Sequence, residues 1–363
     1  MKYQILQGDN RDTLKTLADN SIDAIVTDPP YGIDFLGKDW DANTGALETY
    51  QECLRVLKPG GHILAFSAAR TYHHLAITLE QAGFEIRDQI MWIYSSGFPK
   101  SQDVGRSIQR NQKNKDPNEW LGWGTQLKPA HEPICLARKP IKLSIARNCQ
   151  VHGVGALNID ATRIPADDLP GPGHYSNKSA TGGFNGSVWN NDNPDGQVDA
   201  DSILKSQELG RFPSNVLGEI EGYQKYFYCP KVGRRERNIG CIDPGPQFQV
   251  PSGFDYRMPS SNNANNGESQ VSIVEKNANN GSNNHPTVKP IELMKYLIRL
   301  ITPPGGTVLD PFTGSGSTGC AAVELGYEYI GCELNERYVE IARRRIEAWY
   351  AHIHPLQATG LFE

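Results

Sequence analysis

Two short strings of residues in the sequence carry groups that could do chemistry. The first is Asp28-Pro29-Pro30-Tyr31, which follows an apolar run at residues 22–27 that predicts a strand. Because the two prolines fix φ and lack N–H donors, the carbonyl oxygens of this turn stay free as acceptors. Asp28 adds a carboxylate and Tyr31 a flat aromatic face. Two acceptors beside a stacking surface suit an exocyclic amino group on a planar base; the alternative is a proline-stiffened turn at a strand end.

The second string is rich in glycine and runs over residues 310–318 as DPFTGSGST. Its glycines allow a tight turn and a close approach of the backbone to a ligand, with a helix N-terminus behind them. Glu333 follows Asp310 by 23 residues, about the spacing at which a carboxylate reaches ribose hydroxyls in a doubly wound fold. A phosphate loop would carry Gly-Lys-Ser or Gly-Lys-Thr, and no lysine is present. The string predicts an adenosine-type cofactor, with a glycine turn that only packs a helix on a sheet as the alternative.

The elements that must position these strings alternate between strand and helix. Pro59-Gly60-Gly61 is expected to stop the helix at residues 47–57, and Pro290 to open another helix. The expected strands cover residues 3–7, 22–27, 62–67, 86–94, 132–138, 307–310 and 329–333, and further helices cover 70–82, 317–325 and the residues after Asn335. This alternation predicts a three-layer, doubly wound α/β fold with a mostly parallel sheet. Strands 86–94 and 132–138 are expected to pair antiparallel at one edge.

Composition divides the chain into four segments. Residues 1–140 and 285–350 carry the alternating pattern and one string each, and residues 351–363 form a tail. Between them, residues 141–284 are dominated by Gly, Pro, Asn, Asp and Ser, which predicts an irregular inserted region. Its end, residues 261–284, has nine asparagines and is expected to form a mobile surface loop.

Overall composition excludes several classes of protein. The 363 residues carry a formal net charge of −5, so the chain does not coat nucleic acid by charge alone. The seven cysteines include no CxxC pair, which argues against a disulfide framework or a zinc ribbon, and no metal site is expected. No apolar run reaches the roughly 20 residues of a membrane span, and the N-terminus lacks a leader pattern. These features predict a soluble cytoplasmic protein.

The two strings together are far more specific than either one. With DPPY followed by DPFTGSGST, the sequence resembles the site-specific DNA amino-methyltransferases, which use S-adenosylmethionine to methylate adenine N6 or cytosine N4. The order of catalytic string, variable insert and cofactor string is similar to that of the circularly permuted, beta-type group of this family. The resemblance covers about residues 1–140 and 285–350. Other family-like strings are Gly8-Asp9-Asn10, the LKPGG of residues 57–61, the HEPI of residues 131–134 and the HPTVKP of residues 285–290.

The resemblance implies a Rossmann-like sheet with a defined strand order. The strand ending at Asp310 would be first in space and the strand ending at Glu333 second. The strand at residues 3–7 would come third and the strand ending at Asp28 fourth. All four would then end along one edge of the sheet, where open α/β sheets bind ligands. The insert at residues 141–284 would recognise the target.

The resemblance assigns catalysis to Asp28, Pro29, Pro30 and Tyr31. Asp28 and the Pro29 carbonyl would accept the two amino hydrogens, and Tyr31 would stack on a base flipped out of the duplex. Because the lone pair of an aromatic amine is delocalised, positioning and polarisation must supply most of the acceleration.

The resemblance also assigns a set of residues to the cofactor, which are Asp9, Asn10, Thr287, Lys289, Asp310, Pro311, Phe312, Gly314, Gly316 and Glu333. Glu333 would take the ribose hydroxyls, and Asp9 with Asn10 the adenine edge. Thr287 and Lys289 would meet the methionine carboxylate; the alternative for Lys289 is a solvated charge at a helix start.

Contacts to DNA require cations, and residues 96–150 hold ten Lys and Arg against four Asp and Glu. A second basic cluster consists of Lys225, Lys231, Arg234, Arg235 and Arg237. Phosphate contacts are expected from both, although a solvated surface is the better reading of any single lysine. Trp120 and Trp123 of the first segment are expected to pack under a loop rather than to line a base pocket.

Within the family, adenine N6 is favoured as the target and cytosine N4 is the alternative. The first residue of the catalytic string is more often Ser in N4 enzymes, although Asp, the residue at position 28 here, occurs in them too. An RNA or protein-glutamine methyltransferase would usually carry NPPY, and a DNA-binding module without catalysis would show decayed strings. The implied partner is double-stranded DNA. A cognate restriction endonuclease as a separate chain and a homodimer stay open.

Overall fold

The computed structural model describes residues 2–33, 43–94, 101–111, 118–165, 210–218, 232–241, 283, 285 and 287–355. Apart from Asn283, the asparagine-rich stretch predicted to be mobile lies outside these residues. The chain divides into two compact units. The first unit combines residues 1–88, 134–157 and 230–363, so both chemical strings belong to it, and the second combines residues 89–133 and 158–229.

Eight strands form one sheet, in the order β1-β8-β7-β2-β3-β5-β4-β6. Their bounds are Tyr3–Gln7 (β1), Ile22–Thr27 (β2), Leu57–Phe66 (β3), Glu85–Ile93 (β4), His131–Arg138 (β5), Val216–Gly218 (β6), Thr307–Asp310 (β7) and Glu328–Glu333 (β8). β1 to β8, β8 to β7, β7 to β2, β2 to β3 and β4 to β6 pair in parallel, and β3 pairs with β5 antiparallel. The mostly parallel sheet predicted from the sequence is confirmed.

The strand order differs from the predicted one, which placed the strand of Asp310 first and separated it from that of Asp28. β7 lies between β8 and β2, with Asp310 paired to Gly331 on one side and Leu309 to Ile25 on the other. The strand of Asp310 is therefore the direct neighbour of the strand that leads into Asp28. Pairing between strands far apart in the chain depends on long-range contacts, which the order of motifs does not encode.

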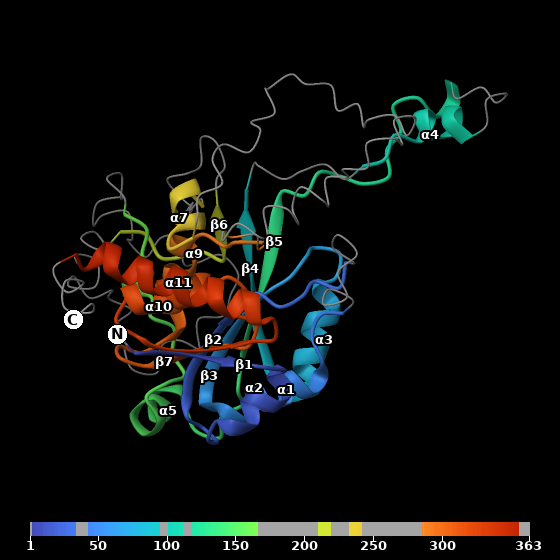
Figure 1. Ribbon diagram of the computed structural model, residues 1–363. Coiled ribbons are helices and arrows are strands. Elements are labelled where there is room, and N and C mark those ends of the chain that lie inside the picture. Colours follow the sequence, from blue (N-terminus) through green and yellow to red (C-terminus); the bar gives the residue numbers. More distant parts are fainter. Residues whose placement is uncertain are drawn as a thin grey trace, which may run out of the picture. The chain divides into compact units, whose positions relative to one another are not determined.

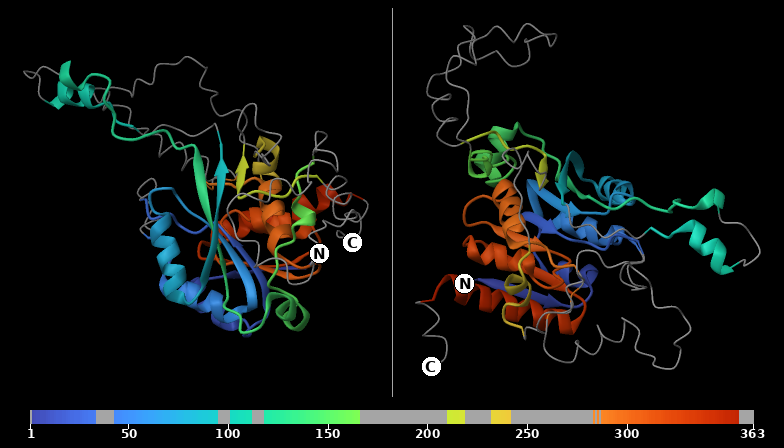
Figure 2. Two further views of the ribbon diagram at one scale, coloured as in Figure 1. Left: turned by 180° about the vertical axis from the view of Figure 1, so that it is seen from behind. Right: turned by 90° about the horizontal axis from the view of Figure 1, so that it is seen from above.

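Helices cover both faces of the sheet in the first unit, which gives the expected three layers (Figures 1 and 2). The bounds of the helices are Asn10–Thr13 (α1), Leu47–Val56 (α2), Tyr72–Ala82 (α3), Val104–Asn111 (α4), Ile145–His152 (α5), Arg234–Asn238 (α7), Ile291–Ile301 (α9), Ser317–Glu324 (α10) and Glu336–Ile353 (α11), with 3-10 turns at Leu14–Thr16, Asn118–Trp120 and Asp160–Thr162. On one face α9 contacts β2 and β3, α10 contacts β7 and β8, and α11 contacts β1 and β8. On the other face α1, α2 and α3 pack against the sheet and one another.

The string Pro59-Gly60-Gly61 ends no helix itself, because α2 already stops at Val56 and the three residues lie inside β3. Ile22 pairs with Leu57 but Ala24 pairs with His62, so the pairing of β3 with β2 shifts across this string. Gly60 has φ +83°, a conformation that glycine adopts freely. The prolines and glycines that predict a turn therefore form an irregularity within a strand.

The sheet also extends one strand beyond the predicted edge. Met91, Trp92 and Ile93 of β4 pair in parallel with Val216, Leu217 and Gly218 of β6, so the β4–β5 pair is not the last of the sheet. A three-residue strand is too short for alternation to reveal it in the sequence.

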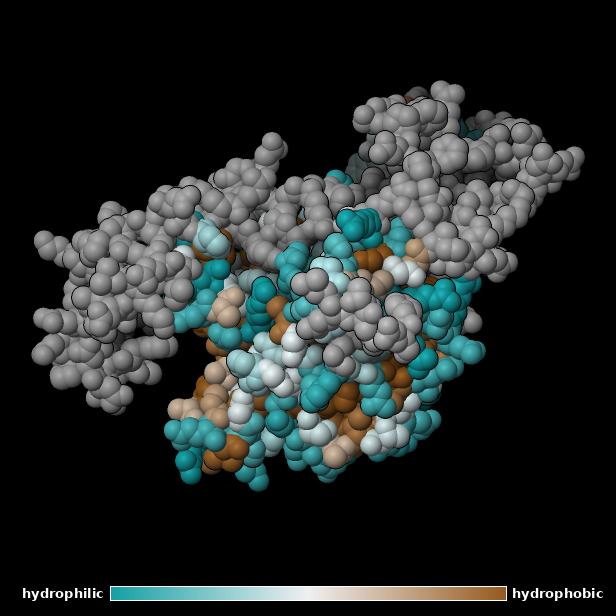
Figure 3. All heavy atoms as spheres, turned by 60° about the vertical axis from the view of Figure 1, so that its left-hand side comes forward, coloured by the Kyte–Doolittle hydropathy of each residue, from teal (hydrophilic) through white to brown (hydrophobic). Residues whose placement is uncertain are grey.

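A core of fully buried side chains joins the sheet to α2 and α3, including Ile25, Tyr50, Ile63, Leu79 and Leu309. The space-filling view of one face shows hydrophilic side chains over much of the described surface, with hydrophobic patches between them (Figure 3). Among the helices in the described part of the chain, none is long and apolar enough to cross a membrane.

Candidate active site

The two chemical strings meet at the point in the sheet where the strand order reverses. From β7 the chain continues to β8 on one side, and from β2 it continues to β3 on the other. In open α/β sheets the carboxyl ends of two such strands are where ligands bind. Asp310 is the last residue of β7, and Asp28 directly follows β2.

A hydrogen bond between side chains joins the two strings. Thr27 Oγ1 donates to Asp310 Oδ1 at 2.6 Å, and the Phe312 N–H donates to the same oxygen at 3.0 Å. Thr318 Oγ1 donates to Asp310 Oδ2 at 2.7 Å. Burial raises the pKa of Asp310 to about 6, against the lowering effect of these donors. Asp310 thus ties the end of β2, the glycine-rich string and the start of α10 together.

Asp28, Tyr31 and Lys289 form a closed triangle of hydrogen bonds. Lys289 Nζ donates to Asp28 Oδ2 at 2.7 Å and to the Tyr31 hydroxyl at 3.0 Å. The Tyr31 hydroxyl donates to Asp28 Oδ1 at 2.9 Å. Both carboxylate oxygens are therefore held in fixed positions, and the Tyr31 ring is fixed by its own hydroxyl.

Lys289 is buried, with only 5% of its surface exposed, so it is not a solvated charge at a helix start. Its ammonium lies 5.0 Å from the centroid of the Phe66 ring and 5.3 Å from that of Tyr31, within reach of cation–π attraction. The structure therefore brings Lys289 to the DPPY string. Thr287 lies half-buried two residues earlier; its role toward a cofactor stays a prediction.

The glycine-rich string folds into a loop against the end of β8. Gly314 and Gly316 have φ +53° and +78°, which glycine adopts without strain, and Gly316 caps α10. The Gly314 N–H donates to Glu333 Oε2 at 2.9 Å and the Asn335 N–H to Glu333 Oε1 at 2.8 Å. Burial raises the pKa of Glu333 to about 7. Glu333 lies at the end of β8 beside the loop, as the spacing predicts.

Asp9 and Asn10 lie beside Glu333, because the Gly8 N–H donates to the Glu333 carbonyl at 3.0 Å. Asn10 Nδ2 donates to the Pro311 carbonyl at 3.0 Å, and Asn10 Oδ1 accepts from Thr49 Oγ1 at 2.8 Å. The side chain of Asn10 therefore supports the loop.

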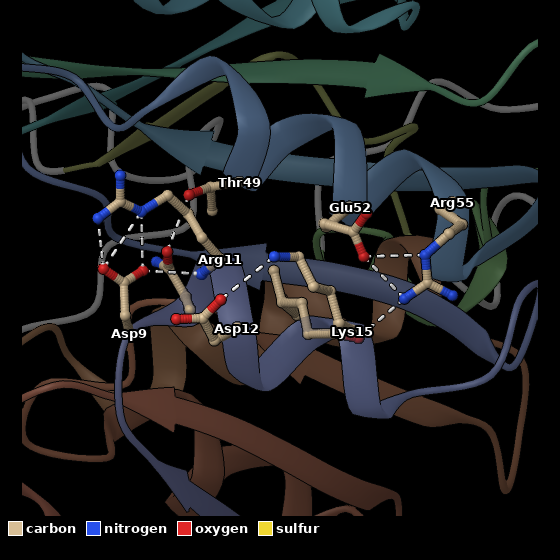
Figure 4. A network of polar contacts seen from close by, with 9 residues as sticks. Asp9, Arg11, Asp12, Lys15, Thr49, Glu52 and Arg55 are labelled. Atoms are coloured by element: carbon tan, nitrogen blue, oxygen red, sulfur yellow. Dashed lines mark hydrogen bonds and ion pairs between the residues drawn. The ribbon is translucent and has the colours of Figure 1, made fainter.

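The carboxylate of Asp9 is also engaged within its own segment. It accepts from the Arg11 guanidinium at 2.6 Å, an interaction drawn in Figure 4. The hydrogen bond from Arg11 lowers the pKa of Asp9. The predicted contact of Asp9 and Asn10 with an adenine edge stays a prediction.

The remaining residues of the two strings pack inward. Pro29 and Pro311 are buried, Pro30 is half-buried, and the Phe312 ring packs beside Tyr50 with 6.4 Å between centroids. Sequence reasoning missed Thr27, Thr318 and Phe66 as parts of the site. Thr27 directly precedes Asp28 and Thr318 ends the glycine-rich string, so both had a signal in their position.

The expected packing of Trp120 and Trp123 under a loop is wrong. The two residues are 44% and 60% exposed, and their rings meet edge to face at 5.5 Å between centroids. Arg106, Arg110 and Lys128 of the same basic segment are exposed. In the described part of the chain, no group of three or more His, Cys, Asp or Glu is arranged to hold a metal ion.

Comparison with known proteins gives matches over nearly the whole chain. A family model described as DNA methylase matches residues 22–344. Type II methyltransferase M.HindIII of Haemophilus influenzae is 24% identical over an alignment of 388 positions, gaps included, which covers 94% of this chain and 94% of that protein. DNA adenine methyltransferase YhdJ of Escherichia coli is 45% identical over 64 residues, which cover 18% of this chain and 22% of that protein. Among solved structures, the M1.HpyAVI–SAM complex aligns over 94% of this chain and 99% of that chain, at 19% identity and a TM-score of 0.44.

Proposed function

Because the chain belongs to the DNA methylase family, we propose that it transfers the methyl group of S-adenosylmethionine to the N6 amino group of adenine in double-stranded DNA. One observation carries this proposal. Thr27 joins the end of β2, where Asp28 begins the DPPY string, to Asp310 of the glycine-rich loop at 2.6 Å. An acceptor for an amino group and a loop for an adenosine-type cofactor therefore share one edge of the sheet.

The residues of the loop fit this cofactor. Gly314 and Gly316 allow the tight turn that places the loop at the end of β8, with the N-terminus of α10 behind it. Glu333 offers a carboxylate that the Gly314 and Asn335 N–H groups hold in place, and it retains lone pairs for ribose hydroxyls. When bound, S-adenosylmethionine supplies a methyl group made electrophilic by its sulfonium.

Asp28 and Pro29 act on the amine. A carboxylate oxygen has two lone pairs, so each oxygen of Asp28 can accept an amino N–H while it keeps its bond to Lys289 or Tyr31. The Pro29 carbonyl accepts the second hydrogen. Two acceptors on the N–H bonds draw the nitrogen out of conjugation and aim its lone pair, and Asp28 holds the hydrogen that the nitrogen loses as it gains the methyl carbon.

Tyr31 offers the stacking face. Its hydroxyl is fixed by Asp28 and Lys289, so the ring has one orientation toward a base. Because the amino group of a paired adenine is engaged in the duplex, the target base must leave the stack to reach Asp28.

Adenine is favoured over cytosine by the residue that opens the string, Asp28, since Ser is the more usual choice for cytosine N4 enzymes. The name of YhdJ, which matches 18% of this chain, agrees with adenine. Cytosine N4 on the same scaffold is the second candidate. An RNA or protein-glutamine substrate is less favoured because Asp28 stands where Asn is usual. A cognate restriction endonuclease and a homodimer stay predictions.

The experiment is incubation of the protein with unmethylated genomic DNA and S-adenosylmethionine, followed by digestion to nucleosides and mass spectrometry. Formation of N6-methyladenine supports the proposal. Formation of N4-methylcytosine would change the assigned target base to cytosine but keep the roles of the site residues. Unmodified DNA together with measurable cofactor binding would contradict a DNA substrate.

A further inference from the structure

The short helix α7 (Figure 1) lies between the two strings in the sequence, yet it is hydrogen-bonded to the segment that carries Lys289. Arg237 Nη2 donates to the His285 carbonyl at 2.7 Å. Asn283 Nδ2 donates to the Arg237 carbonyl at 2.7 Å, and Asn283 Oδ1 accepts from the His285 N–H at 3.0 Å. These three bonds form a closed ring that fixes the start of the segment at residues 285–291.

α7 also fixes the other end of this segment. Glu236 Oε1 accepts from the Ile291 N–H, the first of α9, at 2.5 Å. Pro290, the residue that precedes α9, makes no side-chain cap hydrogen bond. A free N–H at a helix start needs an acceptor, and a negative charge there is favoured by the helix dipole. Glu236 therefore caps α9 from another helix, and Lys289 lies between the two anchored ends.

A buried arginine connects α7 to the glycine-rich loop. Arg345 of α11 is fully buried, and its Nη2 donates to the Glu236 carbonyl at 3.3 Å. Its Nη1 donates to the Ser315 carbonyl and Oγ and, at 3.4 Å, to Ser317 Oγ. The planar guanidinium thus bridges α7 and the loop that precedes α10.

The imidazole of His285 packs directly against this loop. A Cβ at Gly314 would lie 2.7 Å from His285 Nε2, so the ring occupies the space that a side chain at 314 would need. The ring also meets Tyr338 at 4.7 Å between centroids. Burial and the charges of Arg345, Lys289 and Arg237 lower the pKa of His285 to about 3, so the ring is neutral near pH 7.

We infer that Arg237 and Glu236 are positioning residues, which hold His285 against the cofactor loop and Lys289 against Asp28. This inference rests on the proposed cofactor. It concerns two residues of α7 that lie outside the strings on which the resemblance to the family depends. It also replaces the expectation that Arg237 contacts DNA phosphate, because its guanidinium is turned inward to His285. Lys225 and Lys231 of the same basic cluster lie outside the described residues.

The test compares Arg237→Gln with Arg235→Gln, the same change two residues earlier on the same helix at an exposed side chain. S-adenosylmethionine binding is measured by calorimetry without DNA, and thermal unfolding is followed in parallel. Arg237→Gln is expected to raise the Kd about tenfold, the factor that corresponds to a charge-assisted hydrogen bond. Arg235→Gln is expected to stay within about twofold of the unchanged protein.

An unchanged Kd in folded Arg237→Gln would overturn the inference, because Arg237 would then only stabilise the fold. If Arg237→Gln does not fold, Glu236→Ala serves instead, which removes the acceptor of the Ile291 N–H at the start of α9 and that of the Gly233 N–H at the start of α7. Weaker binding supports the inference and unchanged binding overturns it. A protein that binds the cofactor but methylates no DNA would contradict the proposed substrate and leave this result intact.

Discussion

The ammonium of Lys289 lies 2.7 Å from Asp28 Oδ2, although the two residues are 261 positions apart in the chain. The same ammonium donates to the Tyr31 hydroxyl, so one buried cation fixes two side chains of the DPPY string. Burying a cation is unfavourable unless it is paired and hydrogen-bonded. The pair therefore indicates a site built to hold a carboxylate in one orientation.

Lys289→Met should impair chemistry more than cofactor binding. Without the ammonium, Asp28 Oδ2 and the Tyr31 hydroxyl each lose a fixed partner, and small misplacements of catalytic groups lower kcat by about 100-fold. Steady-state kinetics with DNA and calorimetry with S-adenosylmethionine separate the two effects. A large rise in Kd with an unchanged kcat would instead indicate that Lys289 binds the methionine carboxylate of the cofactor.

Thr27→Val should destabilise the protein and weaken the cofactor loop. The change keeps the shape of the side chain but leaves Asp310 Oδ1 without its 2.6 Å donor, and a buried group that loses a partner costs about 1–3 kcal/mol. Denaturant unfolding measures the difference, and Thr27→Ser, which keeps the hydroxyl, is the control. Equal stability of the Val and Ser variants would show that this bond contributes nothing.

Cofactor affinity should increase with pH through the titration of Glu333. With its pKa raised to about 7, the carboxyl is roughly one-tenth ionised at pH 6 and nine-tenths ionised at pH 8. The ionised form is the better acceptor for ribose hydroxyls, so the Kd for S-adenosylmethionine should fall by about tenfold over this range. Glu333→Gln removes the titration and should flatten the profile; a profile of equal slope in the variant would assign the dependence to another group.

Gly331→Ala should displace the cofactor loop, because the added methyl group would clash with Thr313 of that loop. A Cβ at this position of β8 would lie 2.2 Å from Thr313 Oγ1 and 2.7 Å from the Tyr329 hydroxyl, both buried. Overpacking of this kind costs about 1–3 kcal/mol. Thermal unfolding and cofactor binding report it. Gly233→Ala, where a Cβ meets nothing within 4 Å, is the matched control, and equal behaviour of the two variants would contradict the packing of the loop.

The parts of the site that are local in sequence could be predicted from it. Asp28 follows its strand, Glu333 ends its strand, and Asn335 caps α11, because strand patterns and capping residues act over a few positions. Contacts between distant segments could not be predicted. The partner of Lys289, the bond from Thr27 to Asp310 and the place of β7 beside β2 all depend on how the segments pack.

The pattern of charged residues in the sequence was the least informative signal of where a side chain lies in the structure. Arg237 belongs to a run of basic residues that is typical of a solvated surface, yet the residue is half-buried and its guanidinium donates to a backbone carbonyl. A run of like charges does not show which member turns inward, because that depends on carbonyls supplied by another segment.

The exchange Asp28→Asn keeps the size of the side chain and removes its charge, so it tests directly whether the carboxylate acts on the amine. The variant and the unchanged protein are compared for S-adenosylmethionine binding by calorimetry and for N6-methyladenine formation in DNA by mass spectrometry. We expect a Kd within about twofold and a rate of methyl transfer lower by at least about 100-fold, since Asp28 acts on the amine and not on the cofactor. An unchanged rate of methyl transfer by Asp28→Asn would contradict the role given to Asp28. A loss of cofactor binding in this variant would contradict it as well.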